Sequence, residues 1–184
     1  ASAEQKEARR AAVQARIEQR LRARADLRPL VRQVKVVLTR RGVRIDLMDD
    51  ADFSMFELGT TILTKEARGL LEVMAETLKD ESAPLILRGH TDSLPWRGGV
   101  IANNWSLSTG RAEATRQALV LGGVPMNRIA RIEGVADTEP LVADNPADPR
   151  NRRISLLLLE GRGAGAAITR RPAPVAAPAS SVAR

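Results

Sequence analysis

Apolar residues recur along the first part of the chain with the spacing of a helix. Residues 3–27 contain neither Gly nor Pro, and Val13, Ile17 and Leu21 recur every four residues. This spacing places the three side chains on one helical face. The pattern therefore predicts one long helix with a narrow apolar stripe, surrounded by Ala and charged residues.

A second helix is predicted over residues 29–41. Pro29 suits the first position of a helix, because its missing N–H would have no partner there. The apolar positions that follow are helix-spaced, and Gly42 is typical of a helix end. With the first helix, this segment would make residues 1–41 a helical linker.

Residues 42–160 alternate between short apolar runs and amphipathic segments. Thr64 is a suitable N-cap for a helix, whose buried face would contain Leu70, Leu71, Met74 and Leu78. Strands are expected at 43–48, 84–89, 128–134 and 152–159, and another helix at 104–121. The order β-α-β-α-β-β predicts an α+β layer with helices on one face of a mixed sheet.

The last segment, residues 161–184, consists mainly of Gly, Ala, Pro and Ser, with few large apolar residues. Such a segment cannot bury enough surface to offset the entropy of ordering, so we expect a disordered tail. The expected organisation is a linker at 1–41, a domain at 42–160 and this tail.

The net charge of +7 suggests at first a nucleic-acid partner, but the charge is unevenly distributed. Residues 1–41 hold 12 Lys/Arg and 4 Asp/Glu, whereas residues 42–159 hold 13 and 17 and are acidic. The arginines of the first helix spread around it, with no aromatic residue to stack on bases, so nucleic-acid binding is not favoured. A basic helix beside an anionic membrane surface explains the charge equally well.

The residue inventory excludes several kinds of site. The chain has no Cys and one His, which excludes disulfides, Cys-bound zinc and a multi-His metal site. His90 is therefore expected to be structural or to lie at the rim of a site. The carboxylates at 46–52 lack the Gly and terminal Glu of a calcium loop and are expected to form a solvated turn. Neither an acid pair nor a metal site is evident, so we expect no enzymatic activity and no cofactor.

A carboxylate and a guanidinium flank the loop between the strand predicted at 84–89 and the helix predicted at 104–121. Asp92 follows the strand, and Arg111 lies on a helical face that also contains Leu107 and Leu121. A guanidinium among apolar residues is costly without a partner. The two charges could form a structural ion pair, or they could hold a zwitterion by its ammonium and its carboxylate.

Three motifs around these residues resemble the OmpA-like peptidoglycan-binding domain. They are GHTD at 89–92, NWSLSTGRA at 104–112 and NRRI at 151–154. In that family a Thr-Asp ends a strand, an Asn-x-x-Leu-Ser-x-x-Arg-Ala sequence opens a helix, and Asn-Arg-Arg opens the last strand. The resemblance covers about residues 43–160 and implies the family's α+β fold.

The resemblance implies a ligand, the diaminopimelate side chain of the peptidoglycan stem peptide, whose free end carries an ammonium and a carboxylate. Asp92 would accept the ammonium and Arg111 would bind the carboxylate. The other matching positions are Thr91, Asn104, Leu107, Ser108, Arg152 and Arg153. Of these, Thr91 and Ser108 would set backbone geometry near the ligand. One of the two arginines would line the site and the other would be structural.

Within the family, the sequence is most similar to the branch that anchors the flagellar motor stator to the cell wall. The similarity lies in HTDSLPW, NNWSLS, FSMFELGTTILT and DNPADPRNRRISLLLL. It implies the periplasmic domain of a single-pass inner-membrane protein, a homodimer, and a MotA-type partner bound through a membrane helix absent from this chain. Residues 1–41 would be spacer and regulator. The alternative is another OmpA-like wall anchor, either a Pal-type lipoprotein or an OmpA-type outer-membrane protein.

Overall fold

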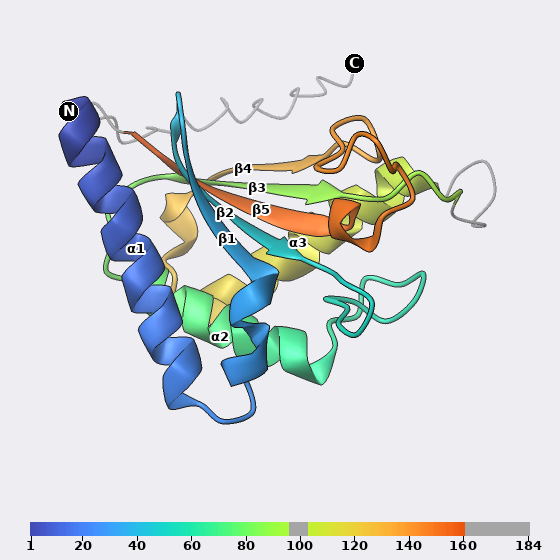
Figure 1. Ribbon diagram of the computed structural model, residues 1–184, viewed down its shortest axis with the longest axis horizontal. Coiled ribbons are helices and arrows are strands. Elements are labelled where there is room, and N and C mark those ends of the chain that lie inside the picture. Colours follow the sequence, from blue (N-terminus) through green and yellow to red (C-terminus); the bar gives the residue numbers. More distant parts are fainter. Residues whose placement is uncertain (96–102, 161–184) are drawn as a thin grey trace, which may run out of the picture.

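The computed structural model describes residues 1–95 and 103–160 (Figure 1). The tail predicted at 161–184 lies outside these residues. In chain order the elements are α1 (Ala3–Ala23), the 3-10 helix η1 (Arg28–Gln33), β1 (Val34–Thr39), β2 (Gly42–Met48), α2 (Lys65–Leu78), β3 (Leu85–His90), α3 (Asn104–Leu121), the 3-10 helix η2 (Met126–Arg128), β4 (Ile129–Gly134), the 3-10 helix η3 (Pro149–Asn151) and β5 (Arg153–Leu159).

The strands form one sheet in the order β1-β2-β5-β3-β4. Neighbouring strands are antiparallel except β3 and β4, which are parallel and are connected through α3. Figure 1 shows α2 below the strands and α3 running behind them. Alternate residues of β5, Ile154, Leu156 and Leu158, point to this helical side and are buried in the core. The prediction of an α+β fold with helices on one face of a mixed sheet is confirmed.

The helix predicted after Thr64 is α2. The Thr64 hydroxyl accepts a hydrogen bond from the Ala67 amide at 3.2 Å and so caps the helix. Its four predicted core residues, Leu70, Leu71, Met74 and Leu78, are each at most 1% exposed. Burial of this apolar face holds α2 against the sheet.

The second predicted helix, over residues 29–41, is wrong, because η1 and β1 occupy this segment. Alternate residues Val34 and Val36 pack on the core, whereas Lys35 is exposed. In so short an apolar run, helical and strand spacing are hard to tell apart. β2 offers unpaired backbone groups, and the full antiparallel register with β1 satisfies them. The element order after α1 is therefore β-β-α-β-α-β-β.

The first predicted helix is α1, and its apolar stripe belongs to the same hydrophobic core as the sheet. Val13, Ile17 and Leu21 are at most 1% exposed, and α1 packs against α2, β1 and β2. Basic residues of α1 and the residue that follows it form ion pairs with acids of the later segment: Lys6–Glu160, Arg9–Glu81, Arg16–Glu81, Arg20–Glu76 and Arg24–Glu72. The basic start of the chain thus meets the acidic middle. The regulatory role predicted for residues 1–41 stays a prediction.

Two glycines let α3 lie directly against the strands. A Cβ atom on Gly89 of β3 would stand 2.0 Å from the Ser108 carbonyl oxygen. A Cβ atom on Gly134 of β4 would stand 2.1 Å from the Thr109 hydroxyl. Both distances are far below van der Waals contact, so only glycine allows the helix this approach. The position of α3, and of every side chain on it, depends on these two residues.

Among the described residues, no helix combines the length and the apolar character that crossing a bilayer requires. The same residues contain no group of three or more His, Cys, Asp or Glu side chains arranged to hold a metal ion.

Candidate ligand-binding site

The candidate site lies at one edge of the sheet, where β2 and β3 end and β5 begins. β2 and β3 run in the same direction, because both are antiparallel to β5. Asp49 therefore follows β2 at the same edge where Asp92 lies just beyond β3, and Arg152 precedes β5 between them. Arg111 reaches the same edge from α3 and lines the same cavity.

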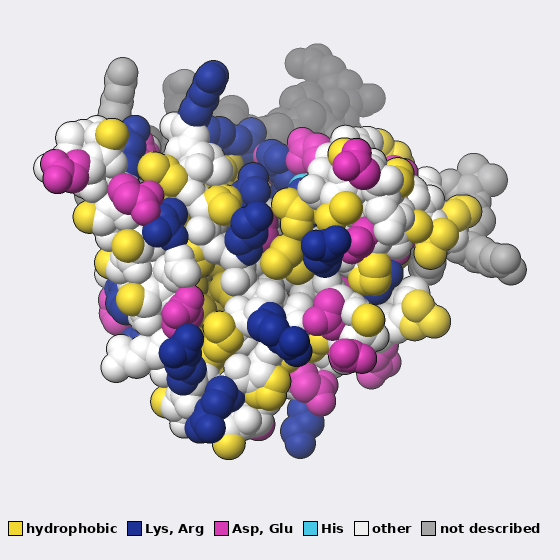
Figure 2. Space-filling view, in the orientation of Figure 1, with side chains coloured by type: hydrophobic (Ala, Val, Ile, Leu, Met, Phe, Trp, Pro, Cys, Tyr) yellow, Lys and Arg dark blue, Asp and Glu magenta, His cyan; other side chains and the backbone are white. Residues whose placement is uncertain are grey.

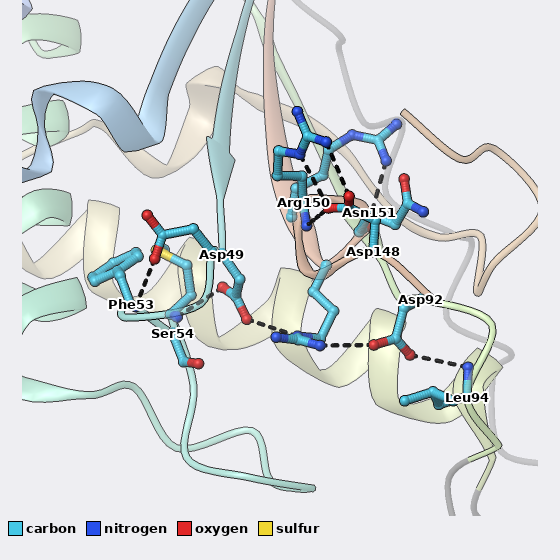
Figure 3. Close-up of polar contacts among 12 residues, drawn as sticks. Asp49, Phe53, Ser54, Asp92, Leu94, Asp148, Arg150 and Asn151 are labelled. Atoms are coloured by element: carbon cyan, nitrogen blue, oxygen red, sulfur yellow. Dashed lines mark hydrogen bonds and ion pairs between the residues drawn. The ribbon is translucent and has the colours of Figure 1, made fainter. Parts of the chain in front are cut away.

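Arg152 bridges the two carboxylates. Its Nε donates to Asp49 Oδ2 at 3.0 Å, and its Nη1 donates to Asp92 Oδ2 at 2.8 Å. Figure 3 shows Asp49 and Asp92 pointing to this guanidinium from opposite sides. Burial lowers the pKa of Arg152, but the hydrogen bonds to Asp92 and Asp49 outweigh it, so the pKa is raised on balance. Arg152 is therefore firmly cationic and fixed in place.

The backbone fixes both carboxylates as well. Asp92 Oδ1 accepts from the Leu94 amide at 3.1 Å, and Asp49 Oδ1 accepts from the Met55 amide at 2.9 Å. Asp49 is 5% exposed. Burial raises its pKa, and the hydrogen bonds from Met55 and Arg152 oppose that shift.

Arg111 is held differently, through groups that carry no charge. Its Nε donates to the Thr60 carbonyl at 2.9 Å, and its guanidinium carbon stands 4.9 Å from the centre of the Phe56 ring. Burial lowers its pKa, and the more distant Asp49 raises it. Within the described part of the chain, Arg111 forms no ion pair. The alternative in which Asp92 and Arg111 bridge each other is therefore wrong, because Arg152 takes that place.

These four charged residues line one cavity of about 510 Å³. Two carboxylates, Asp49 and Asp92, face two guanidiniums, Arg111 and Arg152, so the formal charges of this cluster cancel. The other wall is apolar and includes Phe56 and Leu107. A cavity that is neutral overall but strongly dipolar suits a ligand that carries both signs of charge. We call it the edge cavity.

Three further predicted residues also line the edge cavity, namely Thr91, Asn104 and Leu107. The Thr91 hydroxyl donates to the Asp92 carbonyl at 2.9 Å, and the Asn104 amide donates to the Leu94 carbonyl at 3.1 Å. Both bonds shape the backbone around Asp92. Leu121, which was expected on the face of Arg111, is 88% exposed and lies outside the site.

Ser108 is fully buried and does not line the edge cavity. Its hydroxyl donates to the Trp105 carbonyl at 3.0 Å and accepts from the Ala136 amide at 3.1 Å. The second bond joins α3 to the loop after β4. Ser108 therefore acts on the arrangement of the elements around the site, and not as a wall of the cavity.

Arg152 and Arg153 lie on opposite sides of the sheet. Arg152 lines the edge cavity, whereas Arg153 lines a separate cavity on the face that α2 and α3 leave free. Successive residues at the start of a strand point to opposite faces, which explains the separation. His90, beside Arg153 in the β3–β5 register, lies on that second face and is 3% exposed.

The sequence pattern missed Asp49. The carboxylates at 46–52 were expected to form a solvated turn, but Asp46 and Asp49 are buried. Asp46 belongs to β2 and accepts from Ser155 and Arg44. The sequence did contain a signal for Asp49, because this residue directly follows the strand predicted at 43–48. If that strand runs in the same direction as the strand before Asp92, both carboxylates lie at the same edge of the sheet.

The loop before β5 depends on Asn151, which is fully buried. Its side-chain amide donates to the carbonyls of Val142, Asn145 and Pro146, and its oxygen accepts from the Val142 amide at 2.8 Å. Figure 3 shows Asn151 beside Asp148 and Arg150 in this loop. The first residue of the Asn-Arg-Arg motif thus orders the backbone that presents both arginines.

Comparison with known proteins gives a family and several relatives. The OmpA family model matches residues 55–153. Motility protein B of Escherichia coli is 35% identical over 144 residues, covering 78% of this chain and 47% of that protein. Motility protein B of Bacillus subtilis is 27% identical over 138 residues, covering 73% and 51%. The chain spans about half the length of these relatives.

Solved structures give the same picture of the fold. A MotB-like protein from Desulfovibrio vulgaris has a TM-score of 0.63 at 16% identity, covering 83% of this chain and 98% of that chain. The periplasmic domain of Helicobacter pylori MotB has a TM-score of 0.60 at 16% identity, covering 72% and 85%.

The cell wall anchor of the type VI secretion system from Pseudomonas aeruginosa has a TM-score of 0.61 at 25% identity, covering 78% of this chain and 97% of that chain. The family match includes the cavity residues Phe56, Thr91, Asp92, Asn104, Leu107, Arg111 and Arg152. It also includes the first two sequence motifs in full and the Asn-Arg-Arg of the third. The chain belongs to the OmpA family.

Proposed function

We propose that this domain is a non-catalytic anchor that binds peptidoglycan through the free end of a diaminopimelate residue in the stem peptide. The observation that carries the proposal is the edge cavity, which combines Asp92 and Arg111 in one pocket of about 510 Å³. The free end of diaminopimelate bears an ammonium and a carboxylate on one carbon. The balanced charges of the cavity match that zwitterion.

In this proposal Asp92 accepts the ammonium. Both of its oxygens already accept one hydrogen bond, from Leu94 and from Arg152, and each retains a lone pair. Arg111 binds the carboxylate, since Thr60 occupies its Nε and leaves its terminal Nη groups for a ligand. Because backbone and ring contacts fix Arg111, little side-chain entropy is lost when the ligand binds.

The test compares two kinds of sacculi. Diaminopimelate-type sacculi offer the complete zwitterion, whereas lysine-type sacculi offer the ammonium without the neighbouring carboxylate. We expect the wild-type chain to co-sediment with the first kind much more strongly. Arg111→Leu should lose that preference, because its apolar side chain cannot bind the carboxylate.

Arg116→Leu is the matched control. Arg116 lies on the same helix and pairs with Glu113 outside the cavity, so this variant should keep full co-sedimentation. Circular dichroism of every variant separates lost binding from lost folding. Equal binding of both kinds of sacculi, or unchanged binding by a folded Arg111→Leu, would contradict the proposal.

We further propose that the anchored machine is the flagellar motor stator. The relatives named Motility protein B support this assignment. The chain would then be the periplasmic domain of a single-pass inner-membrane protein, a homodimer, joined to a MotA-type subunit through a membrane helix. Co-purification of the full-length protein with that subunit, and light scattering of this domain, test the two partnerships. Failure to co-purify would contradict the partnership with the MotA-type subunit, and a monomeric mass in light scattering would contradict the homodimer.

A second candidate is an anchor for another envelope machine or an outer-membrane protein of the Pal or OmpA type. The observation in its favour is the 25% identity to the type VI secretion anchor, over 97% of that chain. Both candidates use the same edge cavity, so sacculus binding does not separate them. Loss of motility with normal flagella, after deletion of the gene, would favour the stator.

Residues 1–41 are proposed to regulate wall binding as well as to act as a spacer. α1 packs on α2 and on the β1–β2 side of the sheet, and its residues do not line the edge cavity. Any influence would pass through α2 or through β2, which ends directly before Asp49. Ile17→Asp should detach α1, because Ile17 is 1% exposed and a carboxylate cannot be buried there. If the variant stays folded and co-sediments like the wild type, the regulatory role is wrong.

A further inference from the structure

A second cavity lies on the face of the sheet that α2 and α3 leave free. It has a volume of about 270 Å³ and is distinct from the edge cavity. We call it the open-face cavity. Its lining includes Arg40, Arg41, Arg44, Arg88, Arg153 and Glu139. Five of these residues are arginines, so the walls are strongly cationic.

Not all of these arginines are neutralised. Arg88 forms ion pairs with Glu133 and Glu139, and Arg44 forms one with the buried Asp46. Arg153, Arg40 and Arg41 form no ion pair with any described residue. Since Glu139 is the one acid that lines the cavity, a net positive charge remains.

Arg153 is the most buried of the arginines in this cavity that form no ion pair with a described residue. It is 7% exposed, and its guanidinium donates to two backbone carbonyls, those of Glu139 at 2.9 Å and Asn151 at 3.4 Å. Its Nε atom is buried and has no partner among the described residues. A buried charge without a counter-ion is costly. An anion in the cavity would supply the counter-charge.

His90 and Ser155 also line the open-face cavity, and here too a buried nitrogen lacks a described partner. Ser155 donates to Asp46 Oδ1 and lies 3.3 Å from His90 Nε2, whereas His90 Nδ1 is buried without a described partner. Burial lowers the pKa of His90 to about 3, with Arg153, Arg88 and Arg44 adding to the shift. The imidazole is therefore neutral at pH 7, and the cationic character of the cavity comes from its arginines.

Figure 2 shows Lys and Arg side chains beside the tip of the β1–β2 hairpin, at the top of the view. The hairpin residues Arg40 and Arg41 are exposed, so the cavity can be reached from this side. Its volume is below the range of about 300–1,000 Å³ for drug-sized ligands, so a small anionic group suits it. Guanidinium groups that converge on one space are the usual partners of phosphate.

We propose that the open-face cavity binds a phosphate group through Arg153, Arg44 and the exposed hairpin arginines. This site is separate from the one that binds the wall ligand, and its occupant is an anion instead of a zwitterion. The phosphate can come from a soluble anion or from the headgroup of an anionic phospholipid. The two sources are separated by the test.

The test uses the single histidine as a reporter. Because the chain contains one His, its ring signals in an NMR spectrum are assigned without ambiguity. Sodium phosphate is titrated against sodium chloride at matched ionic strength and pH 7.5. We expect saturable shifts of the His90 signals with phosphate only, and a rise of about 3 °C in Tm near saturation.

Arg153→Met should lose both responses, and Arg44→Gln should weaken them. Arg131→Met is the matched control, because Arg131 is exposed on β4, pairs with Glu133 and does not line the cavity. Arg111→Leu should keep the phosphate response even if wall binding is lost. The two sites can therefore fail or succeed independently.

Vesicles separate the two sources. If the wild type floats with phosphatidylglycerol vesicles and Arg153→Met does not, the site binds a lipid headgroup. If the His90 signals respond to free phosphate and the protein does not float with vesicles, the site binds a soluble anion. No saturable His90 shift in the wild type with either probe would overturn the proposal. Equal responses of the wild type and Arg153→Met would overturn it too. The wild-type NMR result decides even if Arg153→Met does not fold.

Discussion

The edge cavity and the open-face cavity each contain one of two adjacent arginines, and their main chemical difference is the compensation of charge. Arg152 lies between two carboxylates, at 3.0 and 2.8 Å. Arg153 points to the other side of the sheet and donates to backbone carbonyls, and it has no carboxylate partner among the described residues. Two consecutive residues therefore belong to two different clusters: Arg152 to a neutral, dipolar one and Arg153 to a cationic one.

The comparison teaches how a strand can serve two ligands with similar residues. Arginine supplies the positive charge on both faces, and the acids decide what each face can bind. Asp49 and Asp92 balance the edge cavity, which leaves room for a zwitterion. Asp46 is buried, accepts from Arg44 and Ser155, and acts on Arg153 only at a distance, without an ion pair between described atoms, so the open face keeps an excess of positive charge.

The largest expected effect comes from breaking the balance at the edge. Asp49→Ala removes a buried partner of Arg152 and an acceptor of the Met55 amide. Loss of one member of a buried ion pair costs about 3–5 kcal/mol, and the remaining bond to Asp92 places the cost near the lower value. Urea unfolding at pH 7 measures it. A loss under about 0.5 kcal/mol would show that Asp49 and Arg152 do not depend on each other.

Gly89→Ala should disturb both faces together. The added Cβ would overlap the Ser108 carbonyl, so β3 and α3 must separate. Overpacking of this kind costs about 1–3 kcal/mol, and overlap with a backbone atom favours the upper value. Chemical shifts of His90 and of the Arg111 side chain are the measurement. If the shifts of one residue change and those of the other do not, the two cavities do not share α3 as a support.

The open face should become more stable as the pH rises, through His90, whereas the raised pKa of Asp49 at the edge gives a dependence of the opposite sign. The pKa of His90 is lowered to about 3, mainly by burial, against about 6.5 in the unfolded chain. The unfolded state therefore binds a proton that the folded state refuses. Stability from this residue is fully present above pH 6.5 and falls as the pH falls toward 3, by up to about 1.4 kcal/mol per pH unit.

His90→Gln isolates this contribution. The variant cannot take up the proton, so its free energy of unfolding should fall about 2 kcal/mol less than that of the wild type between pH 6.5 and pH 5. Both proteins are measured by urea unfolding in buffers free of phosphate. Parallel pH profiles for the two proteins would mean that His90 is not held neutral by its surroundings.

The smallest effect is expected at the exposed control positions. Arg131 pairs with Glu133 at 3.2 Å, but its side chain is 57% exposed. Exposed ion pairs contribute about 0–1 kcal/mol, so Arg131→Met should change the free energy of unfolding by less than about 0.5 kcal/mol. A larger change would indicate that the outer face of β4 is packed against something beyond the described residues.

Most helices and strands could be predicted from the sequence, because the spacing of their apolar residues is sustained over many positions or is distinctive. The boundaries of α3 and the buried face of α2 agree with the prediction. The error at β1 has a physical origin. The apolar spacing of a run such as VKVVLT fits a helix and a strand equally well. It forms a strand because it pairs with the neighbouring strand, which a local sequence pattern does not reveal.

The site was predictable only as far as its motifs reach. Asp92, Arg111 and Arg152 line one cavity, but the sequence assigned no role to Asp49 and could not tell Arg152 from Arg153. Which side of the sheet each arginine points to depends on the residue at which β5 begins. Moving that start by one residue would exchange the sides of Arg152 and Arg153. The excess charge of the open face is a property of the sheet register, which brings Arg44, Arg88 and Arg153 together from three strands.

The central place of β5 in the sheet has a consequence for hydrogen exchange. β5 is bonded to β2 on one side and β3 on the other along nearly its whole length, so its amides are shielded from both directions. Its amide hydrogens should exchange only when the whole domain unfolds. Arg152 and Arg153 stand at the start of this slowest-exchanging segment. Both cavities are therefore fixed to the part of the molecule expected to fluctuate least, while the exposed tip of the β1–β2 hairpin, at Arg40 and Arg41, remains free to exchange locally.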